Sequence, residues 1–124
     1  AAGARPARVL LVDDDEAVRQ VVRGGLEMRG FKVLDAGSGE AALALVSEHP
    51  EIAVIDYAMP GMDGAQTAEQ LKRLAPGMPI ILASGHADTA SIERALGGQA
   101  TVLRKPFDIA ELSETMTRML AAGG

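Results

Sequence analysis

Short apolar segments alternate along this chain with longer amphipathic ones. The apolar segments predict β-strands at 8–12, 32–36, 52–56, 79–83 and 100–104. Four of the five are continuous apolar runs, which is typical of strands covered on both faces of a sheet. Segment 32–36 instead alternates between apolar and polar residues, and this pattern favours a position at the edge of the sheet.

The amphipathic segments predict α-helices at 15–29, 39–48, 64–74, 88–97 and 108–121. Several local signals mark the ends of these helices. Gly30 follows the first helix, where a residue with positive φ is favoured. Asp63 with Gln66, and Asp108 with Glu111, have the spacing of capping boxes that open the third and fifth helices.

Five consecutive strand–helix units predict an α/β fold, a doubly wound parallel sheet with helices on both faces. The length of 124 residues fits a single domain. We expect residues 1–7 to form a linker or disordered leader, residues 8–121 the folded domain, and residues 122–124 a frayed end. In open sheets of this kind, ligands bind beyond the carboxyl ends of the strands.

The composition excludes several classes of function. A net charge of −5 with no basic stripe argues against direct nucleic-acid binding, and the 2% aromatic content argues against base stacking. The chain has no cysteine, so disulfides and cysteine-based zinc sites are excluded. No membrane span or signal peptide is evident in the sequence, and we expect a cytoplasmic location.

The predicted strand ends carry the candidate chemistry, namely Asp13, Asp14, Asp56, Ser84 and Lys105. Carboxylates gathered at one place repel each other, and a divalent cation removes this repulsion. Because all the candidate ligands are oxygens, Mg²⁺ is favoured over zinc. A lysine and a hydroxyl can bind phosphoryl oxygens, so a carboxylate can attack phosphorus to form an aspartyl phosphate. We interpret the neighbouring Asp15 as a helix cap.

Four motifs in this order resemble the receiver domain of two-component response regulators, a CheY-like module. They are Val12-Asp13-Asp14, Asp56 with Met59-Pro60-Gly61-Met62-Asp63-Gly64, Ala83-Ser84-Gly85, and Lys105-Pro106-Phe107. The resemblance covers about residues 7–121. It implies a (βα)5 fold with the flavodoxin-like strand order 2-1-3-4-5, and a cis peptide bond between Lys105 and Pro106.

The resemblance also implies a function. Asp56 is expected to accept a phosphoryl group from a phosphohistidine of a histidine kinase or histidine phosphotransfer protein, while Ser84 and Lys105 bind the phosphoryl oxygens. The expected Mg²⁺ ligands are Asp14, Asp56, the backbone carbonyl of Ala58 and, through a water, Asp13. Phosphorylation is expected to shift the face made by the fourth helix, the fifth strand and the fifth helix. Such a domain is a signalling module rather than a conventional turnover enzyme.

Some features differ from the family pattern or leave choices open. Val102 stands where the family often has a Tyr or Phe that takes part in switching, so the output route stays open. Ala58 and His86 occupy positions that tune the lifetime of the phosphoryl group, and that lifetime stays open too. Arg19 and Arg23 lie off the apolar stripe of the first helix and are interpreted as a solvated face, with a docking role as the alternative.

Two alternative functions remain, a docking module that needs no phosphorylation and a Mg²⁺-dependent phosphatase with an aspartate nucleophile. The phosphatases carry a second acid two residues after the nucleophile, where this chain has Ala58. The alanine-rich leader and the 103–107 stretch favour the receiver of a hybrid histidine kinase over a stand-alone receiver or the receiver of a transcription factor. The domain is expected to be a monomer or a weak homodimer without membrane contact.

Overall fold

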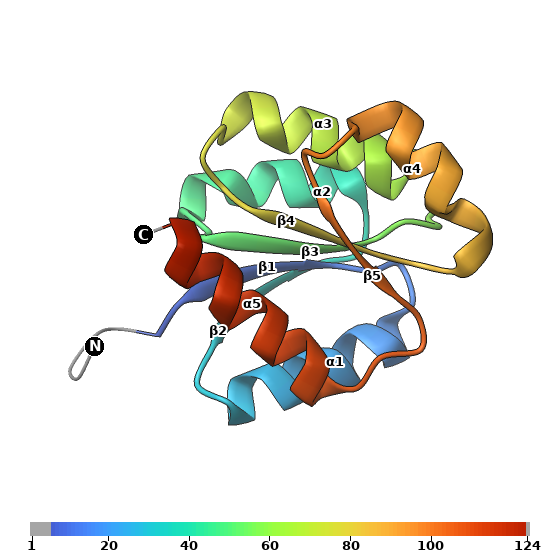
Figure 1. Ribbon diagram of the computed structural model, residues 1–124. Coiled ribbons are helices and arrows are strands. Elements are labelled where there is room, and N and C mark those ends of the chain that lie inside the picture. Colours follow the sequence, from blue (N-terminus) through green and yellow to red (C-terminus); the bar gives the residue numbers. More distant parts are fainter. Residues whose placement is uncertain (1–5, 124) are drawn as a thin grey trace.

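The computed structural model describes residues 6–123, without the side chain of His86 (Figure 1). The strands are β1 (Arg8–Val12), β2 (Lys32–Ala36), β3 (Ile52–Asp56), β4 (Ile80–Ser84) and β5 (Thr101–Arg104). The α-helices are α1 (Glu16–Met28), α2 (Gly39–Ala44), α3 (Gly64–Leu74), α4 (Thr89–Leu96) and α5 (Ile109–Gly123). Two 3-10 turns complete the fold, η1 (Leu45–Glu48) and η2 (His86–Asp88). Most of the expected leader and the last residue lie outside the described part.

The predicted strand–helix alternation is confirmed, with small shifts at the element ends. Strand β4 begins and ends one residue later than predicted, so that Ser84 is its last residue. The second predicted helix is α-helical only to Ala44 and continues as the 3-10 turn η1. Its end is set by His49, which has a φ of 59° and precedes Pro50, because a residue before proline is disfavoured in the right-handed helical region.

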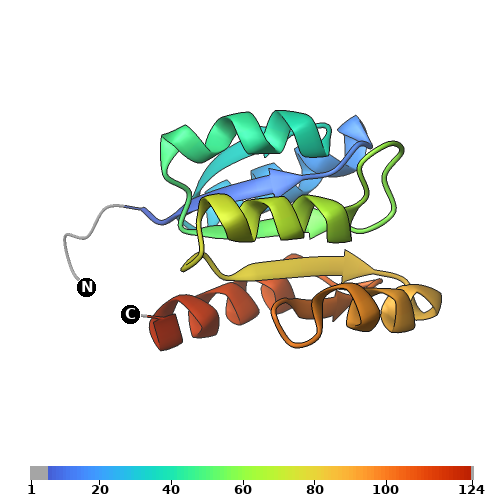
Figure 2. The ribbon, with the colours of Figure 1, turned by 90° about the horizontal axis from the view of Figure 1, so that it is seen from above.

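The strands form one parallel sheet in the order β2-β1-β3-β4-β5, as expected. All five strands therefore run the same way, as the arrows of β1 and β4 show in Figure 2, and the carboxyl ends of the strands meet at one edge of the sheet. The chain runs outward from β1 to β2 on one side and from β3 to β5 on the other. The order reverses between β1 and β3, which is where ligands bind in sheets of this kind.

The two faces of the sheet carry two separate cores. Helices α2, α3 and α4 cover one face, and α1 and α5 cover the other (Figure 1). Successive strand residues face opposite ways, so that Leu10 belongs to the first core while Val9 and Leu11 belong to the second. All five residues of β3 and of β4 are buried. These central strands are therefore rigid supports for the residues at their ends.

The helix ends follow the local signals in the sequence. The Asp15 carboxylate accepts a hydrogen bond from the Val18 N–H at 3.1 Å, which confirms Asp15 as the N-cap of α1. Asp63 and Gln66 form the predicted capping box of α3. Gly30 has the predicted positive φ, at 93°. No helix in residues 6–123 combines the length and apolar character needed to cross a membrane.

Candidate functional site

Three carboxylates meet where the strand order reverses. Asp13 and Asp14 follow β1, and Asp56 is the last residue of the neighbouring strand β3. One carboxylate oxygen from each of the three residues lies within 4.8 Å of the others. Asp13 and Asp56 are each only 8% exposed, whereas Asp14 is exposed. The predicted acid cluster is thus present, with two buried acids and one exposed acid.

Lys105 reaches this cluster from the edge of the sheet. It follows β5, and its Nζ lies 2.5 Å from Oδ1 of Asp56. The parallel ladder continues past the strand, since the Lys105 N–H donates to the Ser84 carbonyl at 2.9 Å. The Lys105–Pro106 peptide bond is cis, as the resemblance implied. The ammonium supplies the positive charge that faces the acids in this structure.

Ser84 ends the strand that lies between β3 and β5. It is 2% exposed, and its hydroxyl has no hydrogen-bond partner within the described part of the chain. Buried hydroxyl groups usually have a partner, so an unpaired one calls for an explanation. Ser84 lies at the same edge of the sheet as Asp56 and Lys105, because β4 pairs with β3 on one side and with β5 on the other.

The protonation of Asp13 reflects its surroundings. Burial raises the pKa of Asp13 above its ordinary value of 3.8, and the nearby carboxylates of Asp56 and Asp14 raise it further. The Asp15 N–H, which donates to Asp13 Oδ1 at 2.9 Å, and the Lys105 ammonium act in the opposite direction. A divalent cation would favour the charged carboxylate. The donor set consists of oxygens, which fits Mg²⁺.

The loop from Tyr57 to Asp63 packs tightly behind Asp56. Gly64 begins α3, and its N–H donates to the Tyr57 carbonyl at 2.8 Å. A Cβ at Gly64 would lie 2.5 Å from the Tyr57 Cα and 2.6 Å from the Asp56 carbonyl oxygen. Only glycine allows this approach, so α3 fixes the backbone beside Asp56. Ala58, the predicted carbonyl ligand, lies exposed in this loop.

One part of the site was missed by the sequence reasoning. Arg19 is not part of a solvated face, because its side chain is only 14% exposed. Its Nη1 donates to the Asp13 carbonyl at 2.7 Å, and its Nε donates to Asp35 at 2.8 Å. Arg23 is more exposed and also pairs with Asp35, without a contact to Asp13. The acid Asp35 within the edge strand was the available signal.

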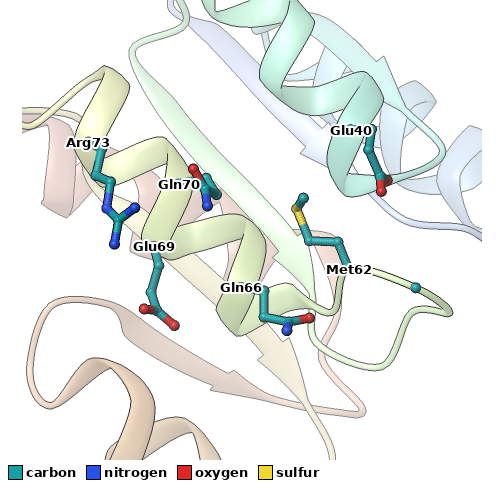
Figure 3. A pocket seen from close by; sticks show the side chains of 7 residues that line it. Glu40, Met62, Gln66, Glu69, Gln70 and Arg73 are labelled. Carbon is teal, nitrogen blue, oxygen red and sulfur yellow. The ribbon is translucent and has the colours of Figure 1, made fainter.

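A groove near the loop after Asp56 does not include the site. It has a volume of about 590 Å³ and lies between α2 and α3 (Figure 3). Its lining comprises Glu40, Gly61, Met62, Gln66, Glu69, Gln70 and Arg73. None of the clustered acids, Ser84 or Lys105 lines it. The groove is therefore not the place where the predicted chemistry gathers.

Comparison with known proteins gives a consistent result. The profile of the response regulator receiver domain matches residues 9–117. Response regulator MprA of Mycolicibacterium vanbaalenii is 38% identical over 119 residues, which are 93% of this chain and 51% of that protein. Sensor kinase CckA of Brucella abortus is 38% identical over 119 residues, covering 92% of this chain and 12% of that protein. The chain thus spans about half, or less, of these relatives.

A solved structure shows the same architecture. The receiver domain protein from Clostridium thermocellum superposes with a TM-score of 0.87 at 28% sequence identity. The match covers 94% of this chain and 95% of that one. The parallel sheet with order 2-1-3-4-5 is therefore shared over almost the whole length of both chains.

Proposed function

Because this chain belongs to the response regulator receiver domain family of two-component signalling, we propose that Asp56 is its phosphoacceptor. The observation that carries this proposal is the environment of the Asp56 carboxylate. It is almost buried, lies within reach of the other two acids, and is paired with Lys105 at 2.5 Å. The Asp56 carboxylate thus lies between the acids Asp13 and Asp14 on one side, called the acidic side below, and the Lys105 ammonium on the other. An incoming phosphoryl group would meet it there.

The acidic side suits Mg²⁺. The ligands would be Asp14, Asp56 and the carbonyl of Ala58, with Asp13 acting through a water. When bound, the ion supplies positive charge that offsets the carboxylates and the phosphoryl oxygens. The arrangement of the acids supports this assignment, because burial and the neighbouring carboxylates of Asp56 and Asp14 raise the pKa of Asp13, and a bound cation would offset both effects.

Asp56, Lys105 and Ser84 would have different roles in the transfer of the phosphoryl group. A carboxylate oxygen of Asp56 forms the new bond to phosphorus as the bond from phosphorus to the donor histidine nitrogen breaks, and the electron pair stays on the imidazole. The Lys105 ammonium pairs with a phosphoryl oxygen, and the Ser84 hydroxyl donates a hydrogen bond to another. Ser84 is suited to this role because its buried hydroxyl has no competing partner in the described structure.

The partners follow from this chemistry. The donor would be a phosphohistidine on a histidine kinase or a histidine phosphotransfer protein, and the domain itself would contact neither nucleic acid nor membrane. It acts in the cytoplasm as a phosphorylated signalling module and not as a conventional turnover enzyme. The similarity to the sensor kinase CckA is compatible with a receiver attached to a kinase.

The output surface would be the face formed by α4, β5 and α5. Strand β5 is an edge strand with both ends exposed, and Val102 within it is partly buried against the core. Val102 has no aromatic ring to rotate, so an aromatic side chain at this position does not link phosphorylation near Ser84 and Lys105 to the output face. Those two residues are joined by the hydrogen bond between the Lys105 N–H and the Ser84 carbonyl.

Incubation with Mg²⁺ and acetyl phosphate tests the proposal, with intact mass as the readout. The expected result is an adduct of one phosphoryl group that is lost in Asp56→Asn and kept in Asp15→Asn, which changes only the cap of α1. An adduct that persists in Asp56→Asn would overturn the assignment. Continuous phosphate release from unrelated esters would favour a phosphatase, and a protein that neither binds Mg²⁺ nor gains mass would favour a docking module.

A further inference from the structure

The Asp13 backbone is held from outside the acid cluster. Its N–H donates to the Ala36 carbonyl at 3.1 Å, which continues the pairing of β1 with β2. Its carbonyl accepts a hydrogen bond of 2.7 Å from Nη1 of Arg19. Since the Asp13 carbonyl and the Asp14 N–H belong to one planar peptide unit, a restraint on that oxygen orients the backbone from which both carboxylates extend.

Arg19 itself is held in one orientation. While Nη1 binds the Asp13 carbonyl, Nε donates to Oδ2 of Asp35 at 2.8 Å. The side chains of Arg19 and Asp35 are only 14% and 16% exposed. A planar guanidinium presents its donors in a fixed geometry, so the two bonds restrain each other. Arg19 therefore connects the loop after β1 to the edge strand β2.

The backbone after β2 leaves room for this guanidinium. Gly37 follows the strand, and a Cβ built there would lie 3.2 Å from Nη1 of Arg19, closer than ordinary contact. Three separate segments therefore surround the Arg19 side chain, namely the acidic loop, the end of β2 and the turn after it. Arg23 provides a contrast, because it shares Asp35 with Arg19 but makes no contact with Asp13.

We propose that Arg19 is a positioning residue for the metal site, which orients the Asp13–Asp14 peptide and so sets the affinity and selectivity for Mg²⁺. The proposal rests on the proposed function, because it concerns the same site. Mg²⁺ requires near-ideal octahedral geometry, whereas Ca²⁺ accepts a variable one. A loosened peptide therefore weakens Mg²⁺ binding more than Ca²⁺ binding.

The sign of the effect separates positioning from simple electrostatics. Removing a cation near a metal site strengthens the binding of another cation by reducing Coulomb repulsion. Positioning predicts the opposite, namely weaker Mg²⁺ binding when Arg19 is removed. Arg23→Met is the matched control, since it removes an arginine paired with the same Asp35 without altering a contact to Asp13.

The test is a titration of the 124-residue chain with Mg²⁺ and separately with Ca²⁺, followed through the backbone amides of Asp14 and Tyr57 by NMR. Loss of a residue that orients metal ligands typically costs about tenfold or more in affinity, and we expect such a loss of Mg²⁺ affinity for Arg19→Met. We expect a clearly smaller loss of Ca²⁺ affinity, and for Arg23→Met a Mg²⁺ affinity close to wild type. Arg19→Lys should lie between, because one ammonium cannot reproduce both directed bonds.

The outcomes distinguish a failure of the positioning role of Arg19 from a failure of the proposed phosphoacceptor function. If wild type binds Mg²⁺ and accepts phosphate while both Arg19 variants bind Mg²⁺ as tightly as wild type, the positioning role is wrong and the proposed function stands. Equal losses for both ions, or equal losses in the Arg23 control, also contradict it. If wild type binds no Mg²⁺, both proposals fail. Should Arg19→Met not fold, Arg19→Lys decides between these results.

Discussion

Replacing Ser84 by alanine should make the protein more stable and less able to accept a phosphoryl group. Ser84 is 2% exposed and its hydroxyl is unpaired among the described residues, so the folded state carries the desolvation cost of this group without a hydrogen bond in return. Alanine removes that oxygen and keeps the Cβ. A stabilising substitution at a functional position is the expected sign of a group kept for activity.

The magnitude follows from the cost of burying a hydroxyl without a partner, which is about 1–3 kcal/mol in mutational data. Part of this gain is lost because the oxygen also makes packing contacts and leaves a small cavity. A net gain of about 1 kcal/mol in the free energy of unfolding is therefore expected, which raises the Tm by about 3–6 °C for a domain of this size. The loss of a donor to the phosphoryl group should slow phosphorylation by about 100-fold.

Urea denaturation in EDTA, followed by circular dichroism, measures the stability effect, and intact mass after acetyl phosphate treatment measures the rate. Thr67→Val is the matched control, because Thr67 is also buried but its hydroxyl donates to the Asp63 carbonyl at 2.8 Å. Loss of a satisfied hydrogen bond should cost about 1 kcal/mol. The reasoning is refuted if Ser84→Ala destabilises the protein as Thr67→Val does.

Three further predictions concern the same site. Lys105→Met should slow phosphorylation by acetyl phosphate by about 100-fold in a mass-based time course, because it removes the cation that faces Asp56, and an unchanged rate would contradict its role. The raised pKa of Asp13 means that the folded state keeps this proton to higher pH than the unfolded chain, so in EDTA the contribution of Asp13 to the free energy of unfolding should fall as pH rises from about 3.8. Urea titrations across this range should show a shallower fall for Asp13→Asn, and an equally steep fall would exclude Asp13 as the cause. Gly64→Ala should destabilise the protein by about 1–3 kcal/mol in urea and lower phosphorylation, since its Cβ meets the backbone of Tyr57; wild-type stability would show that α3 can shift freely.

The strand ends show why so much of the site was predictable. The apolar runs define where each strand ends, and a parallel sheet brings the carboxyl ends of all its strands to one edge. Asp13, Asp56 and Lys105 were therefore expected together, although they come from β1, β3 and β5. The capping boxes and the positive φ at Gly30 were predictable because they depend only on neighbouring residues.

The contacts that the sequence did not predict depend on side-chain packing between elements. Arg19 and Asp35 are separated by 16 positions, and their pairing requires the actual angle at which α1 lies against the edge strand. The periodicity of α1 shows only that Arg19 lies off the apolar stripe. The 3-10 ending of the second helix was missed for a similar reason, since it depends on how the chain turns through His49 into Pro50.

Direct location of the phosphoryl group tests the central claim most sharply. After treatment with Mg²⁺ and acetyl phosphate, borohydride reduction converts an aspartyl phosphate into homoserine, which peptide mass spectrometry can assign to one position. Homoserine at position 56, absent when Mg²⁺ is withheld, is the predicted result. Homoserine at position 13 or 14 instead, or labelling that ignores Mg²⁺, would show that these strand ends do not form the acceptor site described here.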